Sequence, residues 1–400
     1  MEKRRRPYIA FFGVVVFGFV LYHAMIALEP LLGSTLFDYN TWLDKMATDG
    51  WWRFMWIIGD STEPHFHKTI FGGVAVFVGS VIAYILDRKQ SKLRLTPISY
   101  GNGKIWPWIF AAAFLSTGLV AIMFGALRIE GDAWSATFVP YVSVASAVIL
   151  LYGPRVSVLL TGAILGAVFT TPITIFLRNE LLFPHNLPGV IGSVSGMWIG
   201  GIFTFEICKI LPWMKVRPNT VISPAQVKGE ISVSEYKKRF PNKYFVRRML
   251  ADYSEPMFVG NEIAGTCLII GSLVSWLLNP MHPAYGTGVF PALFLSQILT
   301  GAVAMIVYWE GWRDGDFFPT FVPVVSVAPA MVLQFGGSMF IVVVSAILGA
   351  LSCPAMANMI NRKIPAHWHG MVGFTASMAI CSFGVSVFLQ YLLMVFPGLA

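Results

Sequence analysis

Two segments with nearly the same sequence hold the residues best placed to bind a solute. Residues 137–153 read TFVPYVSVASAVILLYG, and residues 320–336 read TFVPVVSVAPAMVLQFG. Proline lacks an amide hydrogen and pushes the preceding residue out of helical geometry, so we expect a helix break at each Pro. A helix break exposes backbone N–H and C=O groups. Nearby hydroxyls can bind a solute together with these groups. The predicted solute-binding residues are Thr137, Pro140, Ser143, Thr171, Thr320, Pro323 and Ser326.

A plainer interpretation of these residues stays open. Each proline could simply kink a helix, with the Ser and Thr hydroxyls bonded back to the backbone of their own helix. Thr171 lies in the next segment, beside Pro172, where small residues spaced four apart also favour close helix packing.

Carboxylates near expected helix starts are the candidates for gating or ion coupling. Glu63 and Glu255 are each followed by proline, and Asn261 and Glu262 lie slightly further along the second segment. A carboxylate in the apolar zone costs about 2.5–3.5 kcal/mol on insertion scales, which makes it a functional candidate. The alternative is that these acids complement the positive end of a helix dipole, with Pro in the first turn.

Metal and enzyme chemistry are not expected. His65 and His67 form one closely spaced pair, and His367 and His369 form another, but the two pairs are predicted on opposite membrane faces, and a metal needs three or four ligands. The four cysteines lie in apolar runs without a CxxC pair. Phosphate-loop, GxSxG and HExxH motifs are absent. We expect no cofactor other than a coupling Na⁺ or H⁺.

Composition places the chain in a lipid bilayer. Of its 400 residues 56% are hydrophobic and 12% charged, and the mean hydropathy is +0.68. Soluble chains carry roughly 45–50% apolar and about 25% charged residues. A soluble enzyme, a nucleic-acid-binding module and a disordered protein are therefore excluded. The net charge of +8 fits basic cytoplasmic loops rather than nucleic-acid binding.

A membrane helix needs about 20 apolar residues, and the sequence offers eleven such runs. They are 7–29, 67–86, 105–128, 136–152, 155–178, 188–212, 259–278, 286–310, 319–335, 338–361 and 368–396. Residues 37–60 mix charges with tryptophans, which predicts an interfacial amphipathic helix. Together with the first span this segment forms an N-terminal region, 1–62.

Basic residues set the expected orientation. Lys3, Arg4, Arg5 and Arg6 place the N-terminus in the cytoplasm, and eleven crossings then place the basic loops 87–104 and 213–250 there too. Among the residues expected outside, Arg128 and Arg178 are scattered exceptions. We expect a multi-pass protein of the cell membrane, and the compact loops favour a bacterial inner membrane.

Self-comparison reveals a duplication. The two TFVP segments match at eleven of seventeen positions at a shift of 183, and Glu63-Pro64 matches Glu255-Pro256 at a shift of 192. The repeats are 63–212 and 255–400, joined by a basic linker, 213–254. Five spans in each repeat would make the second copy enter the membrane from the opposite face. If the TFVP segments are re-entrant, the copies are instead parallel.

These features predict an all-α polytopic membrane protein that acts as a secondary transporter. It would move a small polar or anionic solute by alternating access, coupled to H⁺ or Na⁺. The alternatives are a channel on the same scaffold and a membrane-embedded metal-dependent enzyme or sensor. The expected partners are the small-molecule solute and the lipid bilayer, not nucleic acid, and a homo-oligomer stays open.

Overall fold

The computed structural model describes residues 6–91, 93, 96–124, 136–216, 233–315 and 317–399, and within them the chain is helical without strands. Several basic residues that entered the prediction of orientation lie outside the described residues: Lys3, Arg4, Arg5, Lys92, Arg94, Arg128 and those in the middle of the basic linker, 217–232.

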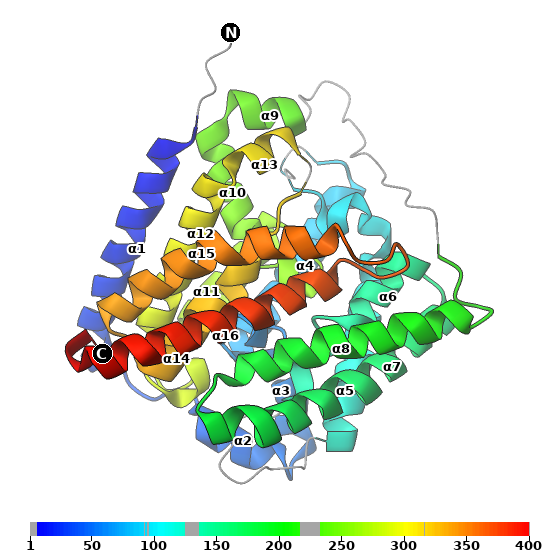
Figure 1. Cartoon of the computed structure of the whole chain (residues 1–400), viewed down its shortest axis with the longest axis horizontal. Coiled ribbons are helices and arrows are strands. Elements are labelled where there is room, and N and C mark those ends of the chain that lie inside the picture. Colours follow the sequence, from blue (N-terminus) through cyan, green and yellow to red (C-terminus); the bar gives the residue numbers. More distant parts are fainter. Residues whose placement is uncertain are drawn as a thin grey trace.

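The helices follow the order of the two repeats (Figure 1). The first half contains α1 (Tyr8–Leu28), α2 (Tyr39–Met46), α3 (Gly50–Gly59), α4 (Ile70–Arg88), α5 (Trp106–Phe124), α6 (Val144–Tyr152), α7 (Val156–Phe176) and α8 (Gly189–Ile210). The second contains α9 (Val233–Arg239), α10 (Pro241–Asp252), α11 (Glu262–Leu278), α12 (Phe290–Val307), α13 (Trp309–Asp314), α14 (Val327–Phe335), α15 (Met339–Asn361) and α16 (Met371–Val395).

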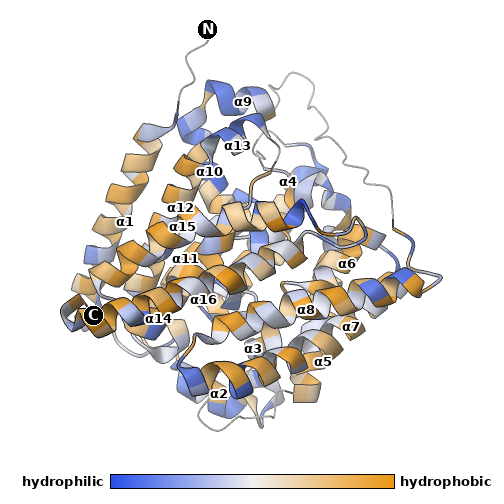
Figure 2. Ribbon diagram, in the orientation of Figure 1, coloured by the Kyte–Doolittle hydropathy of each residue, from blue (hydrophilic) through white to orange (hydrophobic). Residues whose placement is uncertain are grey.

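Among the described residues, eight helices are long and apolar enough to cross a bilayer, where the sequence predicts eleven spans. They begin in α1, α4, α7, α8, α12, α15 and α16 and just before α5. The other three predicted spans are shorter. Proline interrupts two of them, leaving α6 and α14 with nine residues each, and α11 has 17. Apolar residues cover the long helices, whereas α9 and α13 are mostly polar (Figure 2).

The two repeats meet along two helix pairs, and α1 packs in addition against α12 of the second half. Helices α8 and α16 lie side by side in Figure 1, and α4 packs against α11 more extensively than any other pair of described helices. A Cβ on Gly79 would come within 2.8 Å of Cys267, and a Cβ on Gly271 within 2.3 Å of the Phe71 carbonyl. The start of each helix therefore lies beside the middle of the other, and the two helices run antiparallel.

Residues 37–60 form two short helices rather than the single interfacial helix that the sequence predicts. The Asp49 carboxylate accepts the Trp51 amide at 2.8 Å and so starts α3 as a separate helix. Trp42 and Trp56 are fully buried with their rings in edge contact, while Trp51 is exposed. These helices cap the bundle beside the start of α4.

We expect Gly265→Ala and Gly73→Ala to destabilise the protein, because a Cβ there would lie 1.8 Å from the Leu250 carbonyl and 2.3 Å from the Ile58 carbonyl. Overpacking of this kind costs about 1–3 kcal/mol. Gly118→Ala is the control, because nothing lies within 4 Å of a Cβ at that position. Thermal unfolding in detergent measures the effect, and melting of Gly265→Ala at or above the temperature of Gly118→Ala would contradict the packing described.

Acid should weaken the turn between α11 and α12. Burial lowers the pKa of His282 from 6.5 to about 4, against the smaller opposing effects of the Phe37 carbonyl and Asp38. Its Nδ1–H donates to the Phe37 carbonyl at 2.8 Å, and its Nε2 accepts the Ile70 amide at 3.3 Å. The unfolded chain takes up this proton first, so stability should fall as pH drops from 6.5 toward 4.

The control is His282→Phe, which cannot take up that proton. We expect it to be less stable than the native chain at pH 7.5 but to lose less stability between pH 7.5 and 5. Equal losses of melting temperature in the two proteins would show that His282 does not carry the effect.

Candidate functional site

The turn between α3 and α4 carries a buried group that we call the first acidic cluster: Trp56, Asp60, Glu63, Lys68 and Thr137. Lys68 Nζ pairs with Asp60 and, at 2.8 Å, with Glu63 Oε2. Thr137 Oγ1 donates to Asp60 Oδ1 at 3.0 Å and accepts from Trp56 Nε1 at 3.0 Å. The Trp56 ring lies 3.9 Å from Lys68 Nζ. Two carboxylates thus share one ammonium group away from water.

The turn between α10 and α11 carries an equivalent second acidic cluster: Arg248, Asp252, Glu255, Trp312 and Thr320. Arg248 pairs with Asp252 Oδ1 at 2.6 Å and also with Glu255. Thr320 Oγ1 donates to Asp252 Oδ2 at 2.8 Å and accepts from Trp312 Nε1 at 3.2 Å. The guanidinium carbon of Arg248 lies 4.7 Å from the Trp312 ring. The contacts of the first cluster are repeated with different residues.

The cation of each cluster comes from a different place in its repeat. Asp60, Glu63 and Thr137 match Asp252, Glu255 and Thr320 at the repeat shifts, whereas Arg248 matches Trp56 and Lys68 matches Gly260. A Cβ on Gly260 would lie 2.8 Å from Glu255 Oε1, so this position leaves no room for a lysine. The same chemistry is therefore assembled twice from partly different positions.

A tyrosine turn from the opposite repeat closes each cluster. The Ser99 amide donates to the Val259 carbonyl at 2.8 Å, and the Ala284 amide donates to the His67 carbonyl at 3.0 Å. The next residues are Tyr100 and Tyr285, both with positive φ, in the sequences YGNG and YGTG. Each tyrosine thus lies over a glutamate of the other repeat.

The two tyrosines stay protonated beside these carboxylates. Burial, and then the neighbouring Glu63, raise the pKa of Tyr285 well above its usual value. Desolvation and the neighbouring Glu255 do the same for the pKa of Tyr100. Both hydroxyls therefore remain able to donate a hydrogen bond.

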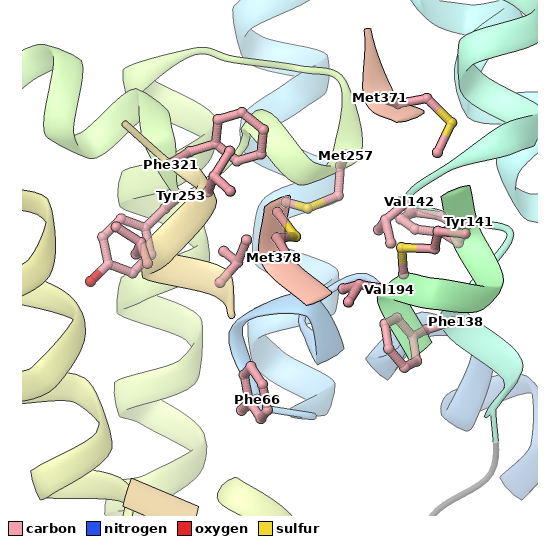
Figure 3. Close-up of a cluster of buried hydrophobic side chains, with 14 of the residues drawn as sticks. Phe66, Phe138, Tyr141, Val142, Val194, Tyr253, Met257, Phe321, Met371 and Met378 are labelled. Atoms are coloured by element: carbon pink, nitrogen blue, oxygen red, sulfur yellow. The ribbon is translucent and has the colours of Figure 1, made fainter. Parts of the chain in front are cut away.

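A cavity of about 300 Å³ lies between the halves, and both acidic clusters reach it. Its charged or titratable lining residues are Glu63, Tyr100, Arg178, Glu255, Tyr285 and His369. Most other lining side chains are apolar. Figure 3 shows buried apolar side chains from both repeats. Of those labelled, seven line the cavity: Phe66, Phe138, Val142, Val194, Phe321, Met371 and Met378.

The helix breaks predicted at Pro140 and Pro323 are present. Irregular backbone separates the turn Ala136–Phe138 from α6, and the turn Val322–Val325 precedes α14. Both prolines are buried, but neither lines the cavity, which is instead lined by their neighbours Phe138, Val142, Phe321 and Val325.

The predicted hydroxyls lie behind the cavity wall. Thr137 and Thr320 belong to the acidic clusters. Ser143 Oγ donates to the Val139 carbonyl at 2.6 Å, and Ser326 Oγ donates to the Val322 carbonyl at 2.7 Å. Thr171 is buried outside the cavity lining. Direct solute contact by these hydroxyls stays a prediction, and the structure gives four of them internal partners.

Asn261 and Glu262 have structural partners away from the cavity lining. Asn261 Oδ1 accepts the Ile263 amide at 2.9 Å and so caps α11. Glu262 Oε1 pairs with Arg247, whose Nε donates at 3.1 Å, and Glu262 Oε2 accepts the Thr96 amide. Their role in coupling remains a prediction.

The histidines are dispersed. His67 bonds Ser272 Oγ and Gln297 Oε1, each at 2.9 Å, and Gln297 in turn donates to the His65 and Val324 carbonyls. Of the remaining histidines, His369 lines the cavity. Within the described part of the chain, no three His, Cys, Asp or Glu residues come together as a metal site.

Sequence reasoning did not single out Asp60, Asp252, Tyr100 or Tyr285, and it gave Lys68, Arg248 and Arg178 no role at the site. Two repeated patterns could have identified four of them. Asp-x-x-Glu-Pro occurs at 60–64 and 252–256, and Tyr-Gly-x-Gly occurs at 100–103 and 285–288. The cations follow no repeated pattern. Comparison of the chain with known protein families and with curated proteins gives no match.

We expect Arg248→Met to destabilise the protein strongly, because it leaves the buried Asp252 and Glu255 without their cation. Removing one partner of a buried ion pair costs about 3–5 kcal/mol. The double variant Arg248→Met/Glu255→Gln removes one of the stranded charges and should recover part of the loss. Thermal unfolding in detergent provides the comparison, with Arg155→Met as the control outside both clusters. A double variant less stable than the single one would contradict this account of the cluster.

Proposed function

We propose that the chain is a secondary transporter that moves a small solute by alternating access around the cavity between its halves. One observation carries the proposal: a cavity between the two repeats at which each repeat contributes a buried acidic cluster. Few polar groups among many apolar ones are typical of small-molecule sites. The apolar helices around the cavity make the bilayer the setting of this movement.

Alternating access requires two halves that face opposite sides of the membrane, and repeat contacts support this. Gly79 of α4 and Gly271 of α11 occupy equivalent positions in the two repeats, and each contacts the early part of the other helix. The antiparallel helices α4 and α11 are therefore related as by a two-fold axis perpendicular to them. Repeats related by an axis in the membrane plane are inverted, as in many secondary transporters. In this proposal the segments containing α6 and α14 cross with the long helices, and the N-terminus is cytoplasmic.

The charge balance of the clusters favours coupling to a cation. Each cluster holds two carboxylates for one basic side chain, all but fully buried. Asp60 Oδ2 and Glu255 Oε2 accept no hydrogen bond from the described residues. An uncompensated charge away from water is expensive, so a proton or a small cation in each cluster would restore neutrality. H⁺ or Na⁺ moving with the solute would serve this role.

Alternation would then follow from the cross-repeat turns. Tyr285 covers Glu63 and Tyr100 covers Glu255, so each cluster has a cover supplied by the opposite half. When the halves rock, one cover must lift from its cluster, because the two turns belong to different halves. A cation bound in a cluster changes the charge next to the tyrosine that covers it, and so shifts the equilibrium between the two orientations of the halves.

Uptake into proteoliposomes under imposed H⁺ and Na⁺ gradients tests the proposal. Across a panel of labelled small solutes, at least one should accumulate only with a gradient and saturate with concentration. Glu255→Gln should lower gradient-driven accumulation at least about tenfold, while solute exchange between the two sides persists. Glu206→Gln is the control, since Glu206 is half-exposed and bonded to His367 and Trp368 outside the cavity.

Two results would overturn the proposal. Flux that does not saturate and ignores every gradient would indicate a channel. Gradient-driven accumulation that is the same in Glu255→Gln and Glu63→Gln as in the native chain would remove the clusters from coupling.

A further inference from the structure

Within the described parts of the chain, one basic side chain, Arg178, reaches the cavity outside the acidic clusters. It follows α7 in the π-helical turn Leu177–Leu182, is 6% exposed and lines the cavity. Its guanidinium carbon lies 4.9 Å from the Phe183 ring. A charged side chain inside a membrane protein is costly, so its position in the cavity wall makes Arg178 a functional candidate.

Two glycines of α8 hold this side chain in place. A Cβ on Gly189 would lie 2.9 Å from Arg178 Nε, and a Cβ on Gly192 would lie 2.5 Å from its Cγ. A larger residue at either position would push the arginine away from this place against α8. The wall is therefore shaped around the guanidinium.

The second repeat keeps this cradle without the charge. Asn361 matches Arg178 at the shift of 183, and Gly370 and Gly373 match Gly189 and Gly192 at a shift of 181. A Cβ on Gly373 would lie 2.3 Å from Asn361 Oδ1, so Asn361 occupies the equivalent cradle. Asn361 does not line the cavity. The fold thus accepts a neutral side chain in this cradle, and packing alone does not require the positive charge at 178.

Among the described residues, Arg178 is the basic side chain that an anion in the cavity would meet. Glu63 and Glu255 line the cavity, but their cations Lys68 and Arg248 lie behind the wall and do not. A guanidinium binds carboxylates through two parallel hydrogen bonds, and burial strengthens that attraction. Around it the lining is aromatic and aliphatic.

Resting on the proposed transport function, we propose that the cavity takes an amphipathic organic anion, with its carboxylate on Arg178 and its apolar body between the two repeats. The body would contact Phe66 and Phe138 from one half and Phe321 and Met378 from the other. A fully polar anion would leave most of this wall without a favourable contact.

The test compares matched probes on the purified full-length protein in detergent. Phenylacetate, phenylacetamide and phenethylamine share one apolar body and differ in the charge of the head group. Phenylacetate should raise the melting temperature saturably and more than the other two. Arg178→Asn, which borrows the residue of the second cradle, should weaken phenylacetate binding about tenfold or more. Arg178→Lys should keep part of the affinity, and Arg155→Asn at the opposite end of α7 should keep all of it.

Three results would overturn the inference. Equal or larger stabilisation by the amide or the amine would show that the cavity does not select anions. Unchanged phenylacetate affinity in a folded Arg178→Asn would remove the arginine from the site. No stabilisation by phenylacetate or by straight-chain carboxylates from butanoate to decanoate would exclude the ligand class. The transport proposal would survive each result if uptake of a neutral or cationic solute still followed an imposed gradient.

Discussion

The structure depends on burying two carboxylates beside a single cation, twice. The Lys68 and Arg248 pairs hold the turns that start α4 and α11, and these turns set where the cavity begins. Without the cations the carboxylates could not leave water, because the desolvation of an ion costs several kcal/mol even in a relaxed protein. In each cluster a tryptophan donates to a threonine, and that threonine donates to the aspartate and so fixes the orientation of its carboxylate.

Much of the architecture could be predicted from the sequence because it depends on local properties. Apolar runs predicted the long helices. Breaks were also predicted near Pro140 and Pro323, and the backbone leaves helical geometry at Ser143 and Ser326, three residues after each proline. The count of eleven spans exceeds the eight long enough among the described helices. Hydropathy alone does not show how a break shortens the segments containing α6 and α14, and α11 is shorter than its apolar run. Two helices over 37–60 were missed for a similar reason, since one Asp49 cap divides the segment.

The candidate site was predicted only in part, because it depends on contacts that cross the repeats. Glu63 and Glu255 were singled out and line the cavity. Lys68 and Arg248 were not singled out, since their positions do not match in the duplication and only the fold brings them to equivalent carboxylates. Thr137 and Thr320 were chosen as solute ligands, and in the structure they donate to the buried aspartates, so that solute contact by them stays a prediction.

The exchanged tyrosine turns have a consequence for biosynthesis. The hydrogen bond from the Ala284 amide to the His67 carbonyl joins residues more than two hundred positions apart. When the first half leaves the ribosome, the segment that covers its acidic cluster has not been made. That half must therefore stay in the membrane with its acidic cluster uncovered until the second half is synthesised. A fragment that ends at the linker would lack the turn that covers this cluster.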